Sequence, residues 1–138
     1  MILSEPDLVR WGRLIGRTVS TPVFLALRGD LGAGKSVLAR AVAREAGVEG
    51  AVPSPTFNLV FRYATPGGTE VVHIDLYRIR GVDELWELGW DELCHGDEIV
   101  LVEWPERAEE LLPRDRWELA IQLPQGRTDA PAVRVRRA

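Results

Sequence analysis

The feature that most constrains this chain is a glycine-rich turn between a short apolar run and a helical pattern. Residues 23–27 read VFLAL and are bounded by Pro22 and Gly29, which is typical of a buried strand. Residues 35–46 follow with apolar side chains at helical spacing. Strand, glycine turn and helix in succession begin an α/β unit.

The turn, residues 29–36, reads GDLGAGKS and fits the pattern G-x-x-x-x-G-K-[ST]. Its glycines let the backbone aim successive N–H groups at phosphate oxygens, and the following helix adds its positive dipole end. Lys35 would reach the β- and γ-phosphates, and Ser36 would offer its hydroxyl to Mg²⁺. Shuffling the same residues would give this pattern in roughly 6 of 10,000 sequences. The residues predicted to bind the nucleotide here are Gly29, Asp30, Leu31, Gly32, Ala33, Gly34, Lys35, Ser36 and Val37.

Lys35 is the one lysine among 17 basic residues, and the other 16 are arginines. A compact ammonium fits between two phosphates where a planar guanidinium fits poorly. The lack of a second lysine also excludes a GTPase that recognises guanine through an Asn-Lys-x-Asp motif, because that motif needs a lysine and Lys35 already belongs to the phosphate loop. The Leu-Ser-Gly-Gly-Gln signature of transporter ATPases is absent from the sequence.

Two acidic residues are placed near the ends of predicted strands. Glu103 directly follows the apolar residues 99–102, where a phosphate-loop site needs an acid to hold Mg²⁺. A carboxylate that caps the next helix is the alternative for Glu103. Asp75 shares one face of a strand with His73, and a surface acid on a hairpin is the alternative for Asp75. We predict that His73 supports Asp75 rather than binding a metal.

The remaining elements follow from periodicity and turn signals. The turn sequence TPGG at residues 65–68 predicts a β-hairpin after the nucleotide-binding helix. Apolar spacing predicts a first helix over residues 5–16 and an acidic helix over 82–94. The other expected elements are strands 57–64, 70–77, 99–102, 117–123 and 132–136 and a helix over 106–112.

Composition limits the classes of protein that the chain can belong to. Its 138 residues fit a single domain, residues 1–138. One cysteine, Cys94, permits no internal disulfide. No segment approaches the roughly 20 apolar residues of a membrane span, and the amino terminus lacks the pattern of a signal peptide. We therefore expect a cytoplasmic protein with no membrane partner.

The acidic residues are concentrated in one part of the chain. Residues 83–118 contain 3 basic and 13 acidic residues, a net charge of −10. Such a surface repels a phosphate backbone and will not bind nucleic acid directly. The segment is expected to form either a solvated helical face or a docking surface for a basic partner.

Four motifs together resemble one family. They are residues 29–36, SPTF at 54–57, HIDLYR at 73–78 and EWPE at 103–106. Their order and spacing resemble the TsaE family, small bacterial ATPases of tRNA threonylcarbamoyladenosine biosynthesis, over roughly residues 4–127. The resemblance implies a P-loop NTPase domain with a central mixed sheet flanked by helices. It also implies a weak Mg²⁺-dependent ATPase that acts on a complex of the threonylcarbamoyl transferase and its inactive paralogue, and that meets tRNA only through that complex.

The resemblance also implies roles for single residues. Lys35 and the loop amides would bind phosphates, and Ser36 and Glu103 would hold Mg²⁺. Three residues would serve hydrolysis: Asp75, Glu103 and Thr56, the last in a switch-like loop. Trp104 and Arg127, of the pair Gly126-Arg127, would lie near the nucleotide, and a packing role is the alternative for Trp104. The sequence departs from the family pattern at two positions, where Ser36 and Leu8 replace the usual threonines.

Two other functions remain open from the sequence. A small-metabolite kinase could use the phosphate loop with Asp75 as base, although we find no arginine-rich lid insertion and little chain for an acceptor pocket. A non-enzymatic, ATP-dependent interaction module would bind nucleotide with only incidental hydrolysis. A kinase would phosphorylate an acceptor alone, whereas a partner-activated ATPase would need its partners.

Overall fold

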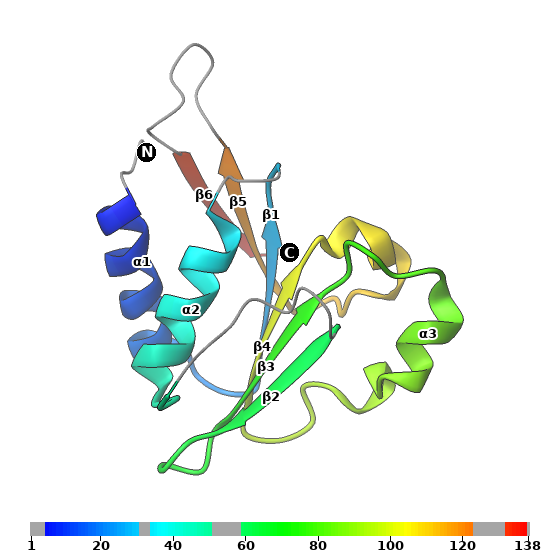
Figure 1. The fold of residues 1–138 in the computed structure, drawn as a ribbon, viewed down its shortest axis with the longest axis horizontal. Helices are drawn as coiled ribbons and strands as arrows, with labels where there is room; N and C mark the ends of the chain where they lie inside the picture. Colours follow the sequence, from blue (N-terminus) through cyan, green and yellow to red (C-terminus); the bar gives the residue numbers. More distant parts are fainter. Residues whose placement is uncertain (1–4, 31–33, 51–58, 123–131, 138) are drawn as a thin grey trace.

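The sheet is built around β1 (Val23–Arg28), the apolar run that precedes the glycine turn. The computed structural model describes residues 5–30, 34–50, 59–122 and 132–137. Across these ranges, six strands form one sheet in the order β2-β3-β4-β1-β5-β6 (Figure 1). The other strands are β2 (Val60–Ala64), β3 (Glu70–Asp75), β4 (Glu98–Glu103), β5 (Trp117–Gln122) and β6 (Ala132–Arg137).

The inner strands of the sheet run parallel and the two edge strands run antiparallel to their neighbours. β1 pairs in parallel with β4 and β5, and β4 pairs in parallel with β3. β2 pairs antiparallel with β3, and β6 pairs antiparallel with β5. The carboxyl ends of the inner strands therefore meet at one edge of the sheet, which is where α/β proteins bind their ligands.

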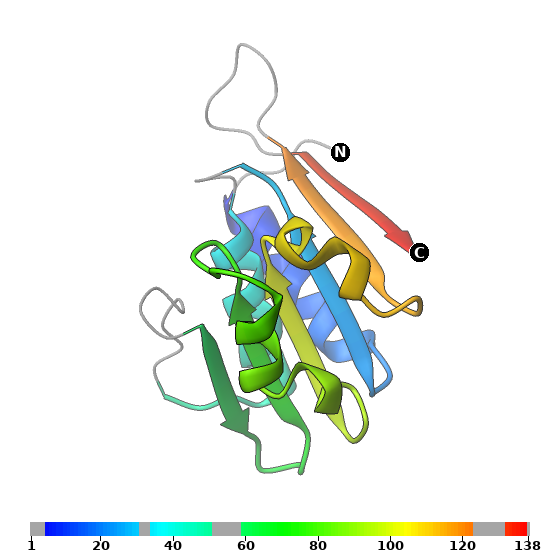
Figure 2. The same cartoon turned by 90° about the vertical axis from the view of Figure 1, so that its right-hand side faces the viewer.

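Helices cover both faces of this sheet. α1 (Glu5–Thr18) and α2 (Lys35–Ala46) lie on one face, and α3 (Val82–Glu87) lies on the other with the 3₁₀ segments η1 (Trp90–Glu92) and η2 (Pro105–Leu111) (Figure 2). The central mixed sheet, its flanking helices and the β2–β3 hairpin after α2 confirm the predicted fold class.

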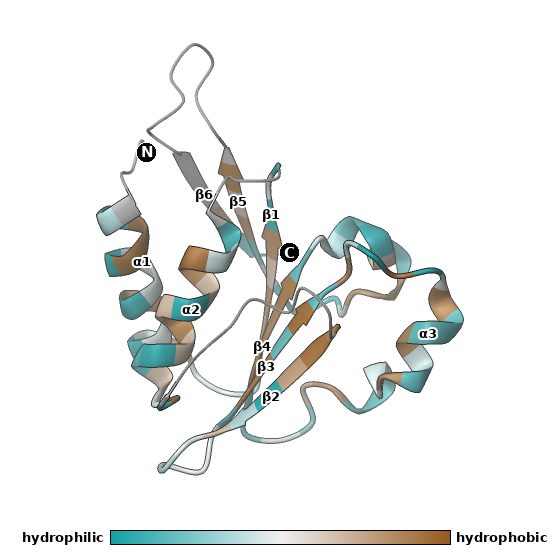
Figure 3. Cartoon of the chain, viewed as in Figure 1, coloured by the Kyte–Doolittle hydropathy of each residue, from teal (hydrophilic) through white to brown (hydrophobic). Residues whose placement is uncertain are grey.

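Both faces of the inner strands are buried, which explains their continuous apolar runs. In β1, Leu25 and Leu27 pack into the core beneath α1 and α2. Phe24 and Ala26 pack into a second core beneath α3 and the two 3₁₀ segments. Figure 3 shows the hydrophobic colour along the inner strands and hydrophilic positions on the helices. A parallel strand covered on both faces needs apolar residues at every position rather than at alternate ones.

α1 approaches α2 so closely that two of its positions have no room for a side chain. A Cβ atom on Gly12 would lie 2.5 Å from the Cβ of Ala41. A Cβ atom on Gly16 would lie 2.7 Å from the carbonyl oxygen of Val42. Residues four apart share one helix face, so the two glycines form a seam along which the backbones of α1 and α2 nearly touch.

Three predicted elements differ from the structure by more than one or two residues at an end, or in the type of helix. The single helix predicted over residues 82–94 is wrong, because α3 ends at Glu87 and Gly89, at φ 80°, turns the chain into η1. The helix predicted over 106–112 is the 3₁₀ segment η2, interrupted by non-helical φ/ψ at Ala108. The strand predicted over 57–64 begins at Val60, and its first two residues lie outside the described ranges. In the ranges that the structure describes, no helix is both long enough and apolar enough to cross a membrane.

Candidate nucleotide-binding site

The predicted phosphate loop leads from the carboxyl end of β1 to the first turn of α2. Gly34 caps α2 with φ 108°, a left-handed conformation that favours glycine. A Cβ atom on Gly34 would also lie only 2.7 Å from Cδ1 of Leu8. The backbone can therefore take this path only with glycine at position 34. The amino terminus of α2 follows directly after Gly34, and the amino terminus of a helix favours bound anions such as phosphate.

Lys35, the first residue of α2, is buried, with 5% of its surface exposed. Its Nζ donates a hydrogen bond to the carbonyl oxygen of Gly29 and lies 3.4 Å from the centre of the Trp104 ring. Burial lowers the pKa of the Lys35 ammonium. Four nearby carboxylates oppose that shift: Glu103, Glu106, Asp75 and Asp30. The lysine is thus a positive charge in an acidic, partly desolvated environment.

Glu103 ends β4 beside the start of α2 and is almost fully buried. The Ser36 hydroxyl donates a hydrogen bond of 3.0 Å to Oε1 of Glu103. The other carboxylate oxygen, Oε2, lies 2.6 Å from Nε2 of His73. A carboxylate buried at this depth costs several kcal/mol unless positive charge or hydrogen bonds compensate it. The predicted metal residues Ser36 and Glu103 therefore lie in contact, although 67 residues separate them in the chain.

The donor set at this position fits a magnesium ion. A hydroxyl and a carboxylate are oxygen donors, and Mg²⁺ is commonly held by one or two such groups together with phosphate oxygens and water. The described residues contain no cluster of three or more His, Cys, Asp or Glu side chains that could hold a metal alone. An ion here would thus need further oxygen ligands from a nucleotide or from water.

Asp75 ends β3 directly beside Glu103, because the two residues are register partners in the parallel pair. Burial raises the pKa of the Asp75 carboxyl, and the neighbouring Glu103 charge adds to that rise. The backbone N–H of Tyr77, 2.9 Å from Oδ1 of Asp75, opposes it. A half-buried carboxylate at this edge can accept a proton or orient a water molecule.

The prediction that His73 supports Asp75 is wrong. The hydrogen bond of His73 goes to Glu103, on the neighbouring strand. Both faces of β3 are covered, so His73 does not lie on an open face of a hairpin. The alternation of residues 72–77 identified the shared face of His73 and Asp75, but only the pairing of β3 with β4 determines which acid the imidazole reaches.

Trp104 contacts both the lysine of the phosphate loop and the ring of Tyr77, and the sequence did not reveal the second contact. Its backbone is left-handed, with φ 58°, which is uncommon outside glycine. The indole lies under the Lys35 ammonium and its centre is 4.9 Å from that of the Tyr77 ring. The guanidinium of Arg107 lies 5.9 Å from the same tyrosine ring. Only the vicinity of Trp104 to Glu103 in the sequence pointed toward this contact.

The other predicted site residues are placed as follows. Asp30 is exposed, and Val37 packs against the core beneath α2. Five predicted residues lie outside the described ranges: Leu31, Gly32, Ala33, Thr56 and Arg127.

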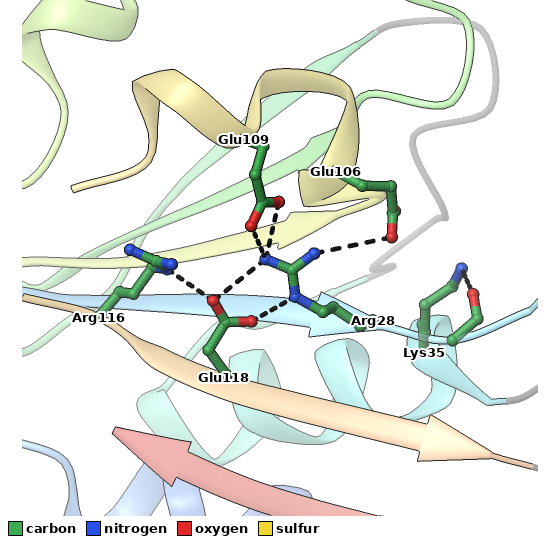
Figure 4. A network of polar contacts seen from close by, with 7 residues as sticks. Arg28, Lys35, Glu106, Glu109, Arg116 and Glu118 are labelled. Carbon is green, nitrogen blue, oxygen red and sulfur yellow. Dashed lines mark hydrogen bonds and ion pairs between the residues drawn. The ribbon is translucent and has the colours of Figure 1, made fainter. Parts of the chain in front are cut away.

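A second polar network, which the sequence did not predict, begins one residue before the phosphate loop. Arg28 ends β1 and forms a hydrogen-bonded ion pair with Glu118 of β5, 90 residues away (Figure 4). The same guanidinium donates to Glu109 of η2 at 2.9 Å, and Arg116 donates to Glu118 at 2.7 Å. The network joins the strand that leads into the loop to the segment that follows Glu103.

Replacing Glu118 with glutamine should lower the free energy of unfolding at pH 7 by roughly 2–3 kcal/mol, because two arginines lose a buried counter-charge. Burial alone would raise the pKa of the Glu118 carboxyl, but hydrogen bonds from Arg28 and Arg116 outweigh it and hold the pKa below its usual value. The native protein therefore loses this stabilisation as pH falls from about 4 through the folded pKa. Urea denaturation should show that the difference in the free energy of unfolding between the native protein and the variant is smaller at pH 3 than at pH 7.

Glu70→Gln is the matched control for this prediction. Glu70 pairs with Arg62 at 2.8 Å, and both side chains are exposed. Loss of an exposed pair should cost less than about 1 kcal/mol. Equal effects of the two substitutions at pH 7 would contradict a stabilising role for the buried network.

The chain as a whole is similar to a group of known proteins. The family model described as "Threonylcarbamoyl adenosine biosynthesis protein TsaE" matches residues 2–130. A Bacillus subtilis protein named tRNA threonylcarbamoyladenosine biosynthesis protein TsaE is 41% identical over 98 residues, covering 71% of this chain and 60% of its own. A Streptomyces coelicolor protein of the same name is 38% identical over 119 residues, covering 85% of this chain and 80% of its own.

A solved structure agrees with these sequence matches. The crystal structure of Bacillus subtilis YdiB is similar to this fold with a TM-score of 0.79 and 27% sequence identity. The similarity covers 100% of this chain and 87% of the YdiB chain.

Proposed function

The chain belongs to the TsaE family of tRNA threonylcarbamoyladenosine biosynthesis, and from that premise we propose that it is a Mg²⁺-dependent, ATP-binding protein with weak ATPase activity. It would support the modification by acting on a complex of the threonylcarbamoyl transferase and its inactive paralogue. It would not transfer the threonylcarbamoyl group itself, and it would meet tRNA only through that complex. We expect it to act in the cytoplasm.

The observation that carries the proposal is the contact between Ser36 and Glu103. The hydroxyl of the loop serine and the strand-end carboxylate lie 3.0 Å apart, beside the buried ammonium of Lys35. This arrangement supplies oxygen donors for a cation, and the positive charge of Lys35, which interacts electrostatically with Glu103, for phosphates. A glycine turn with a surface lysine would have left Lys35 exposed and Glu103 without a partner on α2.

The chemistry divides among a few side chains. The Lys35 ammonium would exchange the carbonyl of Gly29 for phosphate oxygens when nucleotide binds. A Mg²⁺ ion held by Ser36 and Glu103 would neutralise charge on the phosphates. Asp75, beside Glu103 in register, would orient the attacking water. Thr56 and Arg127 would complete the nucleotide contacts, and Trp104 would lie against the bound nucleotide.

The proposal is tested by reconstituting the modification from the purified transferase, its paralogue, tRNA, an activated threonylcarbamoyl donor and this protein. We expect that product formation beyond one turnover per transferase needs both this protein and ATP, because the proposed role is to reset the complex between turnovers. The yield of modified adenosine, measured over many turnovers, gives the readout. Equal yields with and without this protein would overturn the proposal.

The same assay separates the competing functions. A small-metabolite kinase would consume ATP with an acceptor and no partner proteins. A pure binding module would support turnover with a non-hydrolysable ATP analogue. Partner-stimulated ATP hydrolysis that accompanies repeated turnover is expected only for the proposed activity.

A further inference from the structure

His73 is a polar side chain in a position where an apolar one would be expected. It lies in the middle of β3, between Phe61 of β2 and Leu101 of β4, and only 1% of its surface is exposed. Burying an imidazole without hydrogen bonds costs free energy that valine or isoleucine would not. The histidine therefore needs a compensating interaction, and its 2.6 Å contact from Nε2 to Oε2 of Glu103 supplies one.

Hydrogen bonding determines which ring nitrogen carries the proton. Nδ1 of His73 is buried and has no hydrogen-bond partner among the described residues. A proton on Nδ1 would leave a buried donor unsatisfied, at a cost of about 1–3 kcal/mol. A proton on Nε2 instead donates to the carboxylate of Glu103. Between the two tautomers, the arrangement thus favours the one whose Nε2–H is directed at Glu103.

Two donors hold the carboxylate of Glu103 from different elements. The Ser36 hydroxyl of α2 donates to Oε1, and the His73 imidazole of β3 donates to Oε2. Of these two donors, only the histidine is part of the sheet that also carries Glu103. If Ser36 turns toward a cation, His73 remains as the group that fixes the plane of the carboxylate.

We propose that His73 is a positioning residue for Glu103, and that its Nε2–H orients the carboxylate toward the cation that accompanies the nucleotide. The inference rests on the proposed function, because it assumes that Glu103 is a metal ligand. Residues that hydrogen-bond a metal ligand fix its orientation, and their loss commonly weakens metal affinity about 10- to 100-fold. In this role His73 would act only through its hydrogen bond with Glu103 and would touch neither the nucleotide nor the metal.

Substitution of His73 separates positioning from packing. His73→Leu fills the site without a donor, whereas His73→Gln places an amide N–H near the position of Nε2. Affinity for Mn²⁺ in the presence of a non-hydrolysable ATP analogue, measured by electron paramagnetic resonance, should fall about 10- to 100-fold in His73→Leu and recover in His73→Gln. Affinity for the analogue in EDTA should stay within about twofold of the native value in both variants. His95→Gln, at the exposed second histidine, is the matched control.

Each outcome has one meaning. If Glu103→Gln leaves Mn²⁺ affinity unchanged, the metal role in the proposed function fails. If Glu103→Gln weakens Mn²⁺ binding and folded His73→Leu does not, only the positioning inference fails. Should His73→Leu not fold, nitrogen-15 NMR of the native protein decides, since the chain has only two histidines. A proton on Nε2 of His73 supports the inference, and a proton on Nδ1 overturns it.

Discussion

Lys35→Met is expected to weaken ATP binding by roughly 100-fold or more, because in the proposed site the ammonium would supply charge-assisted hydrogen bonds to the phosphates worth about 3 kcal/mol. Methionine keeps most of the length and the apolar character of the lysine stem, so the fold should persist, although the Nζ that lies over the Trp104 ring is lost. Lys35→Arg should also bind poorly, since a planar guanidinium does not fit the space of a compact ammonium. Isothermal titration with ATP measures both variants.

The control for Lys35 is Arg44→Met, at the far end of the same helix. Arg44 is exposed and near the carboxyl end of α2, away from the phosphate loop. Its replacement removes one positive charge from the same helix and should leave ATP affinity within about twofold. An unchanged dissociation constant in Lys35→Met would show that the predicted loop does not bind phosphate.

Glu103→Gln is expected to reduce Mg²⁺-dependent ATP hydrolysis by roughly 100-fold while leaving the protein folded. The substitution removes the negative charge that would hold the cation. Loss of a direct metal ligand should reduce activity by more than the roughly 10- to 100-fold that is typical when a residue supporting a ligand is lost. Glutamine keeps the size of glutamate, and its carbonyl oxygen can still accept from Ser36 or His73. Phosphate release measured across a range of Mg²⁺ concentrations, beside thermal unfolding, separates a catalytic defect from a structural one.

Glu110→Gln provides the matched control for Glu103. Glu110 is an exposed residue of η2, seven positions further along the acidic part of the chain. Loss of its charge should leave the hydrolysis rate within about twofold. A normal rate in Glu103→Gln would mean that the carboxylate is a structural group rather than a metal ligand.

The local parts of the fold could be predicted because each has a short-range signal. β1, the phosphate loop and α2 follow one another within 24 residues, and the predicted bounds of α2 agree with Lys35–Ala46. The TPGG turn likewise identified the β2–β3 hairpin. α3, η1 and η2 were predicted less well, because their acidic sequences fit a helix, whereas the chain leaves helical geometry at Gly89 and again at Ala108.

The contacts of the site depend on long-range register, which a single sequence does not supply. The sequence identified Lys35, Ser36, Asp75 and Glu103 separately. It could not show that β3 and β4 pair in parallel, which places Asp75 beside Glu103 and brings His73 to the same carboxylate. The Arg28–Glu118 pair escaped prediction for the same reason, since it requires β1 and β5 to be neighbours.

The acidic segment 83–118 proves to be more than a uniform charged surface. Several of its carboxylates contact positive or polar groups of the fold, three of them as follows. Glu98 pairs with Arg62, Glu118 with Arg28, and Glu103 with Ser36. Exposed acids such as Asp83 and Glu87 remain available to solvent or to a basic partner. The net charge of −10 therefore overstates the acidity of the surface that this segment presents.

The seam at Gly12 and Gly16 has a consequence for how the molecule fluctuates. Main-chain atoms rather than adjustable side chains set the spacing between α1 and α2, so neither helix can tilt without the other. If α1 or α2 moved away, Leu38 and Val42 would become exposed to solvent, and the remaining helix would lose its packing against the core. The two helices would exchange their amide protons as a single cooperative unit, and nucleotide bound at the start of α2 would slow exchange along the whole of α1.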